Sequence, residues 1–480
     1  MKKSIKSKKS SSKYSSLAGN MFLFSVSNFG SKIISFLLVP LYTYVLTTEE
    51  YGTVDLISTT ATLLIPILTL NIQDAALRFA LDKNYSPKDV ITTALRINLI
   101  GAVILGAGLL ILVFTGLFNI STEYLFFLFL LYFFGALNNA FTLYLKAKDK
   151  VSVIMVSGLL NTFLMCMLNI LFLLVFKTGI TGYLVSMAAA SFASVLYQFF
   201  AGKIFKDIEL RRDKNITREM VVYSLPLVAN SLAWWINNAS DRYILTFMCG
   251  VAINGIYSVA YKIPTILTTV QNIFYNAWSI SAIKEFDSED KDGFIGNIFS
   301  LYSFVSVMSC SAIMILNIPI SSLLYAKEFF EAWKCVPFLL VGTVFNGMAL
   351  FEGCLFTAVK KTKDVSKTTL LGAGINIICN FIFIKFFGAL GAALATMLGY
   401  AVSFLVRSIM MRKIIKIKID RPVIISSYIL MALQSVAALK ENLWYVQIII
   451  FILLIIVQHR YIESFFRKLK NFSKKKNGAK

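Results

Sequence analysis

Charged residues are scarce in this sequence, and their scarcity excludes an ordinary soluble protein. Only 15% of the 480 residues are Asp, Glu, Lys or Arg, and 57% are hydrophobic, whereas soluble domains carry about 25% charged residues. Apolar runs of roughly 20 residues recur along the chain, each long enough to cross a hydrocarbon core of about 30 Å. The composition therefore predicts an all-α, polytopic membrane protein.

Metal-binding and catalytic residue patterns are also missing. The chain has one histidine, His459, and six cysteines without a CxxC spacing, which leaves no His/Cys metal site and no histidine-based catalytic triad. It also lacks a phosphate-binding GxxxxGK[ST] loop and a GxGxxG turn that follows a strand. We therefore expect no catalytic residue, no metal and no cofactor beyond a possible coupling ion, H⁺ or Na⁺.

Apolar runs between polar breaks predict fourteen membrane-spanning helices. The first run, 17–46, is too long for the apolar part of a cleaved signal peptide, so we expect it to remain as a helix. The predicted spans are 17–46, 51–76, 90–115, 122–145, 151–176, 179–202, 220–249, 251–282, 293–316, 334–358, 367–387, 389–411, 422–438 and 443–458.

The basic residues alternate from loop to loop and orient these helices. Lysines and arginines gather at 1–16, 146–150, 203–219, 360–367, 407–421 and 459–480. The intervening turns hold only Lys177, Lys327, Lys334, Lys385 and Lys440. Because cytoplasmic loops are enriched in Lys and Arg, both termini are predicted to be cytoplasmic. The net charge of +22 then reflects topology and contact with anionic membrane lipids rather than nucleic-acid binding.

Landmarks that recur roughly 200 residues apart indicate an internal repeat. EYGTVDL around Gly52 matches NGIYSVA around Gly255, and KTGITGYL after residue 176 matches FFGALGAA after residue 385. We predict two six-helix lobes around a central cavity, with two further helices at the C-terminus. The expected parts are a basic tail (1–16), an N-lobe (17–204), a linker (205–219), a C-lobe (220–412), two added helices (421–458) and a second basic tail (459–480).

Small residues and one acidic loop complete this description of the second half. Gly391, Ala395 and Gly399 are four residues apart, a spacing that lets two membrane helices approach closely. The loop KEFDSEDKDG at 284–293 is predicted to be a solvated connector.

A family resemblance follows from these segments. NMFLFSVSNFGSKIISFLLVPLYTYVLTTEEYGTVDL resembles the opening of Wzx-type bacterial polysaccharide flippases, and SDRYILTFMCGVAINGIYSVAYKI resembles the start of their second half. These flippases form the polysaccharide transporter branch of the multidrug/oligosaccharidyl-lipid/polysaccharide exporter superfamily. The resemblance implies alternating access that moves an undecaprenyl-diphosphate-linked oligosaccharide from the cytoplasmic to the outer leaflet of the bacterial plasma membrane.

When the basic residues near the ends of the spans are assigned to the two membrane surfaces, three remain within the membrane and are the candidate substrate-binding cations: Lys32, Arg242 and Lys262. A charge at mid-bilayer costs at least roughly 2.5–3.5 kcal/mol, so each side chain should face protein or a watery cavity. A diphosphate needs cations, and sugar hydroxyls need hydrogen-bonding groups. Polar and aromatic residues of the right kind lie on the same helices: Asn28, Asn230, Trp234, Trp235, Asn237, Asn238, Gln271 and Asn276. Ion-pair and packing roles are the alternatives for these residues.

Acidic residues within spans are the ion-coupling candidates. Asp55, Asp241 and Glu352 could each bind an ion on one side of the membrane and release it on the other. Asp74, Arg78 and Arg96 are predicted to shape a cytoplasmic gate or its helix ends.

Four other functions stay open at this point. A peptidoglycan-precursor flippase and a multidrug/cation antiporter belong to the same superfamily, but cationic cargo favours acidic rather than basic cavity groups. A membrane glycan polymerase or ligase would need a long external loop, and none is predicted. A purely structural membrane protein is the fourth alternative. The expected partners are the lipid-linked oligosaccharide, membrane lipids, and a glycan polymerase with a chain-length regulator.

Overall fold

The computed structural model describes residues 30, 32–116, 120–209 and 213–459, which contain helices and turns and no β-strand. The all-α prediction is confirmed for this part of the chain. Asn28, the basic tail 1–16 and residues 460–480 of the second tail lie outside the described residues.

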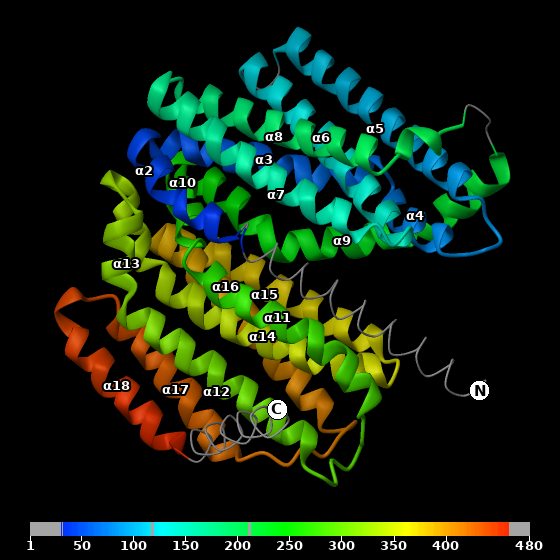
Figure 1. Ribbon diagram of the computed structural model, residues 1–480. Helices are drawn as coiled ribbons and strands as arrows, with labels where there is room; N and C mark the ends of the chain where they lie inside the picture. Colours follow the sequence, from blue (N-terminus) through cyan, green and yellow to red (C-terminus); the bar gives the residue numbers. More distant parts are fainter. Residues whose placement is uncertain (1–29, 31, 117–119, 210–212, 460–480) are drawn as a thin grey trace, which may run out of the picture. The chain divides into compact units, whose positions relative to one another are not determined.

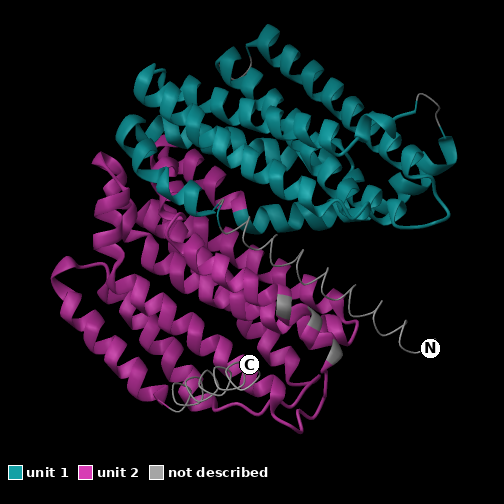
Figure 2. Ribbon diagram, in the orientation of Figure 1, with its two compact units in different colours: residues 1–238 teal, residues 239–480 magenta. Residues whose placement is uncertain are grey.

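The chain divides into two compact units, residues 1–238 and 239–480 (Figure 2). The dividing point lies inside a helix, at Asn238 and Ala239, whereas the linker expected from sequence was 205–219. The lobe boundaries predicted from the repeat stay a prediction.

The first unit consists of helices that follow one another along the chain (Figure 1). They are α2 (Val39–Val45), α3 (Thr48–Leu68), α4 (Ile72–Ala80), α5 (Pro87–Thr115), α6 (Thr122–Ala147), α7 (Val151–Asn169), the π-helix η1 (Ile170–Val175), α8 (Gly179–Ala201), the 3₁₀ turn η2 (Ile204–Lys206) and most of α9 (Lys214–Cys249). Three apolar clusters fill its core, built on Ile72 and Val90, on Tyr144 and Leu145, and on Tyr132.

The second unit continues from the end of α9 and has the same helical character. It contains α10 (Val251–Ala260), α11 (Pro264–Lys284), α12 (Phe294–Ile315), α13 (Asn317–Leu324), η3 (Lys327–Lys334), α14 (Val336–Ala358), α15 (Thr362–Phe387), α16 (Ala389–Met411), α17 (Arg421–Ala437), η4 (Glu441–Leu443) and α18 (Trp444–Val457). Helix α14 is the most enclosed candidate span, with 72% of its apolar window buried. It packs against α11, α12, α16 and α17 and forms the centre of the unit.

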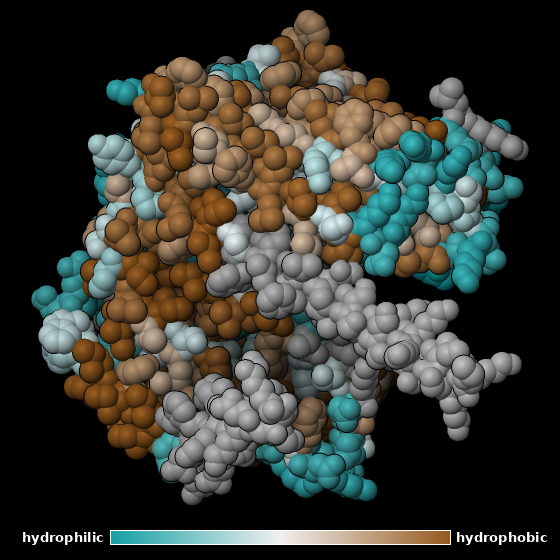
Figure 3. Space-filling view, in the orientation of Figure 1, coloured by the Kyte–Doolittle hydropathy of each residue, from teal (hydrophilic) through white to brown (hydrophobic). Residues whose placement is uncertain are grey.

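Nine of the helices in the described residues are long and apolar enough to cross a membrane, and four shorter apolar helices accompany them. Many large apolar side chains on these helices are exposed, for example Phe114 and Phe247, each at 86%. Figure 3 shows apolar residues along the flanks of the helices and hydrophilic ones where the chain turns at their ends. Such wide apolar surfaces require a lipid environment. The count of fourteen spans stays a prediction.

Three predicted spans are interrupted in the structure. The span 51–76 is divided into α3 and α4, because Leu70 and Asn71 adopt left-handed backbone conformations with φ near +50°. The span 251–282 is divided into α10 and α11 by a turn before Pro264, whose ring cannot continue a preceding helix. In 151–176, the last turns form the π-helix η1. Apolar periodicity carries no signal for such local breaks.

The small residues of α16 lie against α15, as predicted. Gly391, Ala395 and Gly399 are all buried. A side chain at Gly399 would collide with Asn376 of α15, and one at Gly391 would collide with the backbone at Phe383. Because these positions lack bulk, the two helices approach closely along their length. This close contact brings polar residues of α15 and α16 into the core of the second unit.

The loop at 284–293 is largely exposed, in line with the predicted solvated connector, but it contains one buried carboxylate. Asp290 is 2% exposed. Its carboxylate accepts hydrogen bonds from the backbone N–H groups of Ile295 at 3.0 Å and Gly296 at 2.9 Å, and from that of Lys418 at 3.3 Å. An acidic group at a helix N-terminus satisfies donors that the helix leaves unpaired. The loop therefore holds the start of α12 to the segment before α17.

Candidate functional site

A sharp reversal at Gly250 builds the main polar cluster of the second unit. Gly250 has φ +91°, a backbone conformation that other residues rarely adopt. The chain turns back there, so α10 runs beside the end of α9 and carries Tyr257 to Asp241, sixteen residues earlier. Asp241 is 3% exposed. The role of Asp241 as an ion-coupling residue stays a prediction.

Hydroxyl groups surround this carboxylate. Oδ2 of Asp241 accepts a short hydrogen bond from the Tyr257 hydroxyl. It also accepts hydrogen bonds from the hydroxyls of Tyr261 and Thr396, each at 3.2 Å. Oδ1 accepts from the backbone N–H of Arg242 at 3.0 Å. Four donors from α9, α10, the turn after it and α16 thus meet one carboxylate, which is how an ionised group can be held inside a protein.

Two asparagines of α15 extend the arrangement. The Asn376 side chain donates to the Thr396 hydroxyl at 3.4 Å, and Asn380 donates to the Asn376 side-chain oxygen at 3.1 Å. The side-chain oxygen of Asn380 is buried and has no hydrogen-bond partner. We call Asp241, Tyr257, Tyr261, Asn376, Asn380 and Thr396 the Asp241 cluster.

The Asp241 cluster is rich in oxygen atoms that can accept a cation. Hydroxyl groups rotate and can present lone pairs, and Asn380 already has an unused acceptor. Carboxylate, hydroxyl and amide oxygens are the ligands that hard cations prefer, while a proton needs only the carboxylate. Among the described residues, no three His, Cys, Asp or Glu side chains group as ligands for a metal ion. The chemistry therefore suits H⁺ or Na⁺ rather than a transition metal.

Tyr261 also connects the two neighbouring charges at 241 and 242. Its hydroxyl donates to Asp241, and the Arg242 guanidinium lies over its ring, 5.7 Å from the centroid. A cation over a tyrosine face is attracted by the ring quadrupole. Arg242 is half-buried, and so is Lys262, which follows Tyr261 in the sequence. Lys32, the third predicted cation, is exposed and belongs to the first unit, so these residues do not form one site within a single unit.

A second buried carboxylate lies in a separate cluster. Glu352 on α14 is 0% exposed, and its Oε1 accepts from the Ser408 hydroxyl at 2.5 Å. Its Oε2 has no hydrogen-bond partner. Ser408 and Thr396 both belong to α16 and are twelve residues apart, a rise of about 18 Å along a helix. The two acidic residues therefore occupy different levels of the second unit.

Arg407 lies near Glu352, and its burial was not predicted from sequence. We counted Arg407 among the cytoplasmic basic residues at the end of the predicted span 389–411, and the structure places it on α16 with 3% exposure. Its guanidinium donates to the backbone oxygens of Ala349 at 2.5 Å and Val365 at 3.2 Å, and to the hydroxyls of Thr368 and Thr369 at 3.0 and 2.9 Å. One side chain thereby joins α14, α15 and α16.

The remaining predicted residues lie in varied surroundings. Asp55 on α3 is half-buried. Among the predicted gate residues, Asp74 accepts a 2.5 Å hydrogen bond from Asn71, Arg78 pairs with Asp82 at 3.5 Å, and Arg96 is half-buried. The gate assignment stays a prediction.

The predicted polar and aromatic residues divide between local contacts and open positions. The Trp235 indole donates to the backbone oxygen of Thr59 at 3.2 Å, and Asn238 donates to that of Trp234 at 2.6 Å. Gln271 is 5% exposed, and its amide nitrogen has no partner. Asn230 and Asn276 are exposed, and Asn237 is half-buried.

The first unit has an uncharged cluster of tyrosine and asparagine side chains near the point where α2 ends and α3 begins. Tyr42 of α2 stacks on Tyr183 of α8 with ring centroids 4.5 Å apart, and Tyr51 of α3 lies 6.4 Å from Tyr183. Asn169, directly before the π-helix, donates to the Tyr42 hydroxyl at 3.0 Å. These side chains offer hydroxyls and an amide without a carboxylate. The Asp241 cluster therefore has the stronger potential for binding a cation.

The comparisons with known proteins agree with the helical membrane fold. A multidrug resistance MATE family transporter of the MOP superfamily, in an inward-facing conformation, superposes with a TM-score of 0.65 at 13% identity, covering 80% of this chain and 95% of that chain. The lipid II flippase MurJ, in an inward closed conformation, superposes with a TM-score of 0.66 at 16% identity, covering 93% of this chain and 99% of that chain. At these identities the similarity is one of fold.

Sequence comparisons give the family. An uncharacterized membrane protein of Methanocaldococcus jannaschii, MJ1068, is 22% identical over 219 residues, which are 42% of this chain and 43% of that protein. The match thus spans less than half of that relative. The family model described as polysaccharide biosynthesis protein matches residues 17–279, more than half of the chain. This chain therefore belongs to the polysaccharide biosynthesis protein family, and it is a membrane protein with the fold of MATE transporters and of MurJ.

Proposed function

We propose that the protein is a flippase for lipid-linked oligosaccharides. It would move undecaprenyl-diphosphate-linked repeat units from the cytoplasmic to the outer leaflet of a bacterial plasma membrane, by alternating access coupled to H⁺ or Na⁺. The observation that carries this proposal is the family match over residues 17–279, because that family is named for polysaccharide biosynthesis. The fold similarity to a lipid II flippase supports the same class of cargo.

The physical problem posed by such a cargo explains the residues involved. Each sugar hydroxyl costs several kcal/mol to transfer into a medium without hydrogen bonds, and the diphosphate adds charge. The lipid tail can stay in the bilayer while the polar head needs a protein path. In this proposal Arg242, Lys262 and Lys32 attract the diphosphate, since charge-assisted hydrogen bonds to phosphate are among the strong ones. Trp235, Asn237, Asn238, Asn230, Gln271 and Asn276 would contact the sugars.

The Asp241 cluster is the proposed coupling site. A carboxylate held by four donors at 3% exposure can take up a proton or Na⁺, and either ion changes what those donors do. A proton turns an acceptor oxygen into a donor, so the hydroxyls of Tyr257, Tyr261 and Thr396 must rearrange. Since these hydroxyls belong to α10, the turn after it and α16, ion binding would alter how these segments fit together.

Cargo charge separates this proposal from a multidrug antiporter. A cationic drug would be repelled by Lys32, Arg242 and Lys262, whereas a diphosphate would be attracted. The partners proposed with the flippase are a glycan polymerase and a chain-length regulator, which would act on the product at the outer face.

Deletion of the gene in the native host tests the proposal. We expect a lipid-linked oligosaccharide to accumulate on the cytoplasmic side, and export to return with the wild-type gene. A variant with Lys32→Ala, Arg242→Ala and Lys262→Ala should reach the membrane and fail to restore export. A matched control with Lys360→Ala, Lys361→Ala and Lys363→Ala, three exposed residues at the start of α15 and in the turn before it, should restore it. Normal surface glycan in the deletion strain would refute the proposal.

A further inference from the structure

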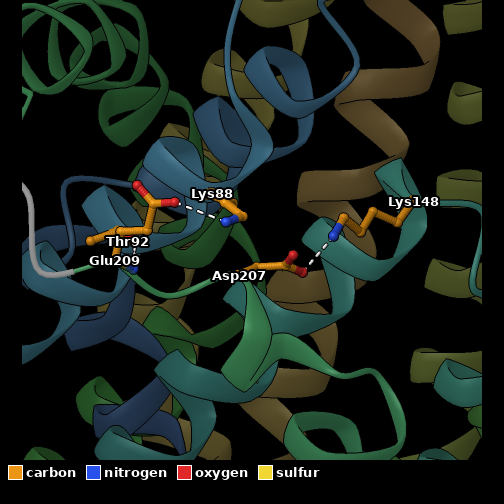
Figure 4. A network of polar contacts seen from close by, with 5 residues as sticks. All are labelled: Lys88, Thr92, Lys148, Asp207 and Glu209. Atoms are coloured by element: carbon orange, nitrogen blue, oxygen red, sulfur yellow. Dashed lines mark hydrogen bonds and ion pairs between the residues drawn. The ribbon is translucent and has the colours of Figure 1, made fainter.

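The segment that follows α8 forms ion pairs with the ends of two helices of the first unit, α5 and α6 (Figure 4). Lys148, at the end of α6, forms an ion pair with Asp207. Lys88, at the start of α5, pairs with Glu209 at 2.9 Å, and the backbone N–H of Glu209 donates to Thr92 at 3.0 Å. These contacts hold the segment 202–209 against the ends of α5 and α6, so the groups on it have defined positions.

Positive charge is in excess at the point where this segment leaves α8. Lys150 donates to the backbone oxygen of Gly202 at 2.5 Å, which places it beside Lys203 and Lys148. Burial and the nearby Lys148 and Lys203 ammonium groups lower the pKa of Lys150, although Asp207 opposes the shift. Within the described part of the chain, Lys150, Lys203 and Lys206 form no ion pair. An added anion would relieve this repulsion.

The acidic groups nearby do not balance these lysines. Asp207 is engaged by Lys148, and Asp149 is exposed between Lys148 and Lys150. Asp149 and Lys203 both have left-handed backbones, with φ +57° and +55°. For residues other than glycine such conformations are uncommon. They orient the two turns that present Lys150 and Lys203.

Exposed aromatic rings lie near these lysines, at the end of the candidate membrane span α8. Phe200, in the last turn of α8, is 61% exposed, and Phe205 is 44% exposed. Their rings lie 6.2 Å apart, and the Lys206 ammonium lies 5.9 Å from the Phe205 ring centroid. Helix α8 is a candidate membrane span that ends at Ala201. Rings at its end would meet acyl chains, and the lysines just beyond would lie at the level of lipid headgroups.

We propose that Lys150, Lys203 and Lys206, with Phe200 and Phe205, form a binding site for one anionic phospholipid. The phosphate would lie between the ammonium groups, and an acyl chain would lie against the two rings. Charge complementarity selects an anionic over a zwitterionic lipid, since each Lys near a membrane surface is attracted to anionic lipid. We call these five residues the elbow site. Because the segment 202–209 leads from α8 toward α9, a bound lipid would steady the first unit at that turn.

The test compares lipid retention by the purified full-length protein in nanodiscs and by native mass spectrometry. Wild type should retain phosphatidylglycerol in preference to phosphatidylcholine. Lys203→Gln with Lys206→Gln should lower that preference roughly thirty-fold, as the loss of two lysine contributions implies. Both lysines are exposed, and the substitutions keep the backbone N–H groups that hydrogen-bond within this turn. Lys361→Gln with Lys363→Gln, another exposed pair, is the matched control and should leave retention unchanged.

Separate outcomes would overturn the elbow site. Equal retention of the two lipids by wild type would show that it is not selective for an anionic lipid. Unchanged retention by the Lys203/Lys206 variant, or an equal loss in the control variant, would show that the lipid binds elsewhere. Inorganic phosphate should not displace the lipid, and displacement at millimolar phosphate would identify a free-anion site instead. None of these outcomes depends on whether the protein transports a glycan.

Discussion

Substitution of Asp241 by Asn tests whether the Asp241 cluster binds the coupling ion. Asn has nearly the same shape, so the change removes the negative charge and leaves the packing of α9 against α10. A unit charge about 4 Å away contributes about 4 kcal/mol at an effective dielectric constant of about 20. That energy corresponds to roughly a thousand-fold in affinity. Arg242, whose guanidinium lies over Tyr261, would reduce this attraction somewhat in the wild type.

The assay is thermal unfolding of the purified protein at increasing Na⁺ concentration and, separately, at decreasing pH. An ion that binds only the folded protein at 100 times its Kd stabilises it by about 2.7 kcal/mol. In Asp241→Asn the Kd would be roughly a thousand-fold larger, so the same ion concentration would be about a tenth of it. The ion would then stabilise the folded variant by close to zero. We therefore expect the Tm of the wild type to rise with ion concentration and that of the variant to stay flat.

Two other carboxylates serve as controls for this experiment. Glu352→Gln and Asp55→Asn remove the remaining acidic candidates, and both variants should keep the ion-dependent rise of Tm. If Asp241→Asn kept the full rise, or if the rise disappeared only in Glu352→Gln, the assignment of the coupling site to Asp241 would be refuted.

Three further predictions concern contacts within the individual units. Arg407→Met should lower the free energy of unfolding by about 3–5 kcal/mol, because Glu352 loses its neighbouring charge, and adding Glu352→Gln should recover part of that loss in chemical unfolding. Tyr42→Phe should cost roughly 1–3 kcal/mol for the lost neutral hydrogen bonds to Asn169 and Tyr183 and leave the ion-dependent Tm unchanged, and a loss of that dependence would place coupling in the first unit. The pKa of Asp287 is lowered by hydrogen bonds from the backbone N–H groups of Lys291 and Glu289. Its contribution to the stability of the loop is therefore present above its ordinary pKa of about 3.9 and is lost as the pH falls through the lowered pKa. Hydrogen exchange in the loop 285–293 should accelerate only below about pH 4, and this acceleration should be absent in Asp287→Asn.

Most helices were predictable from sequence because each needs a long apolar run. The breaks within them were not, because they depend on single backbone conformations such as those of Leu70 and Asn71. Asp241 and Glu352 could be identified as unusual since acidic residues are costly in apolar spans, and both are buried. The hydroxyl partners of Asp241, which are Tyr257, Tyr261 and Thr396, could not be identified, because hydroxyl residues are common in membrane helices and nothing in their spacing distinguishes them.

Arg407 was missed although the sequence contains a signal for it. Gly391, Ala395 and Gly399 predict the face of α16 that meets α15, and the same spacing of four continues to Ser403 and Arg407. Extending that face by two turns would have placed the arginine in the core. The positive-inside reasoning counted it with the basic segment 407–421, although it lies within the predicted span 389–411. That reasoning concerns only the side of the membrane, whereas helical periodicity indicates which groups the side chain contacts.

Translocation in reconstituted liposomes tests the proposed function most directly. The lipid-linked oligosaccharide that accumulates in the deletion strain would be placed in proteoliposomes and its exposure measured with a glycosidase that cannot enter them. We predict that an ion gradient accelerates exposure in liposomes with the wild-type protein, and that Asp241→Asn abolishes this acceleration. Exposure at the rate of protein-free liposomes, in the presence of folded protein and a gradient of either Na⁺ or H⁺, would contradict the account.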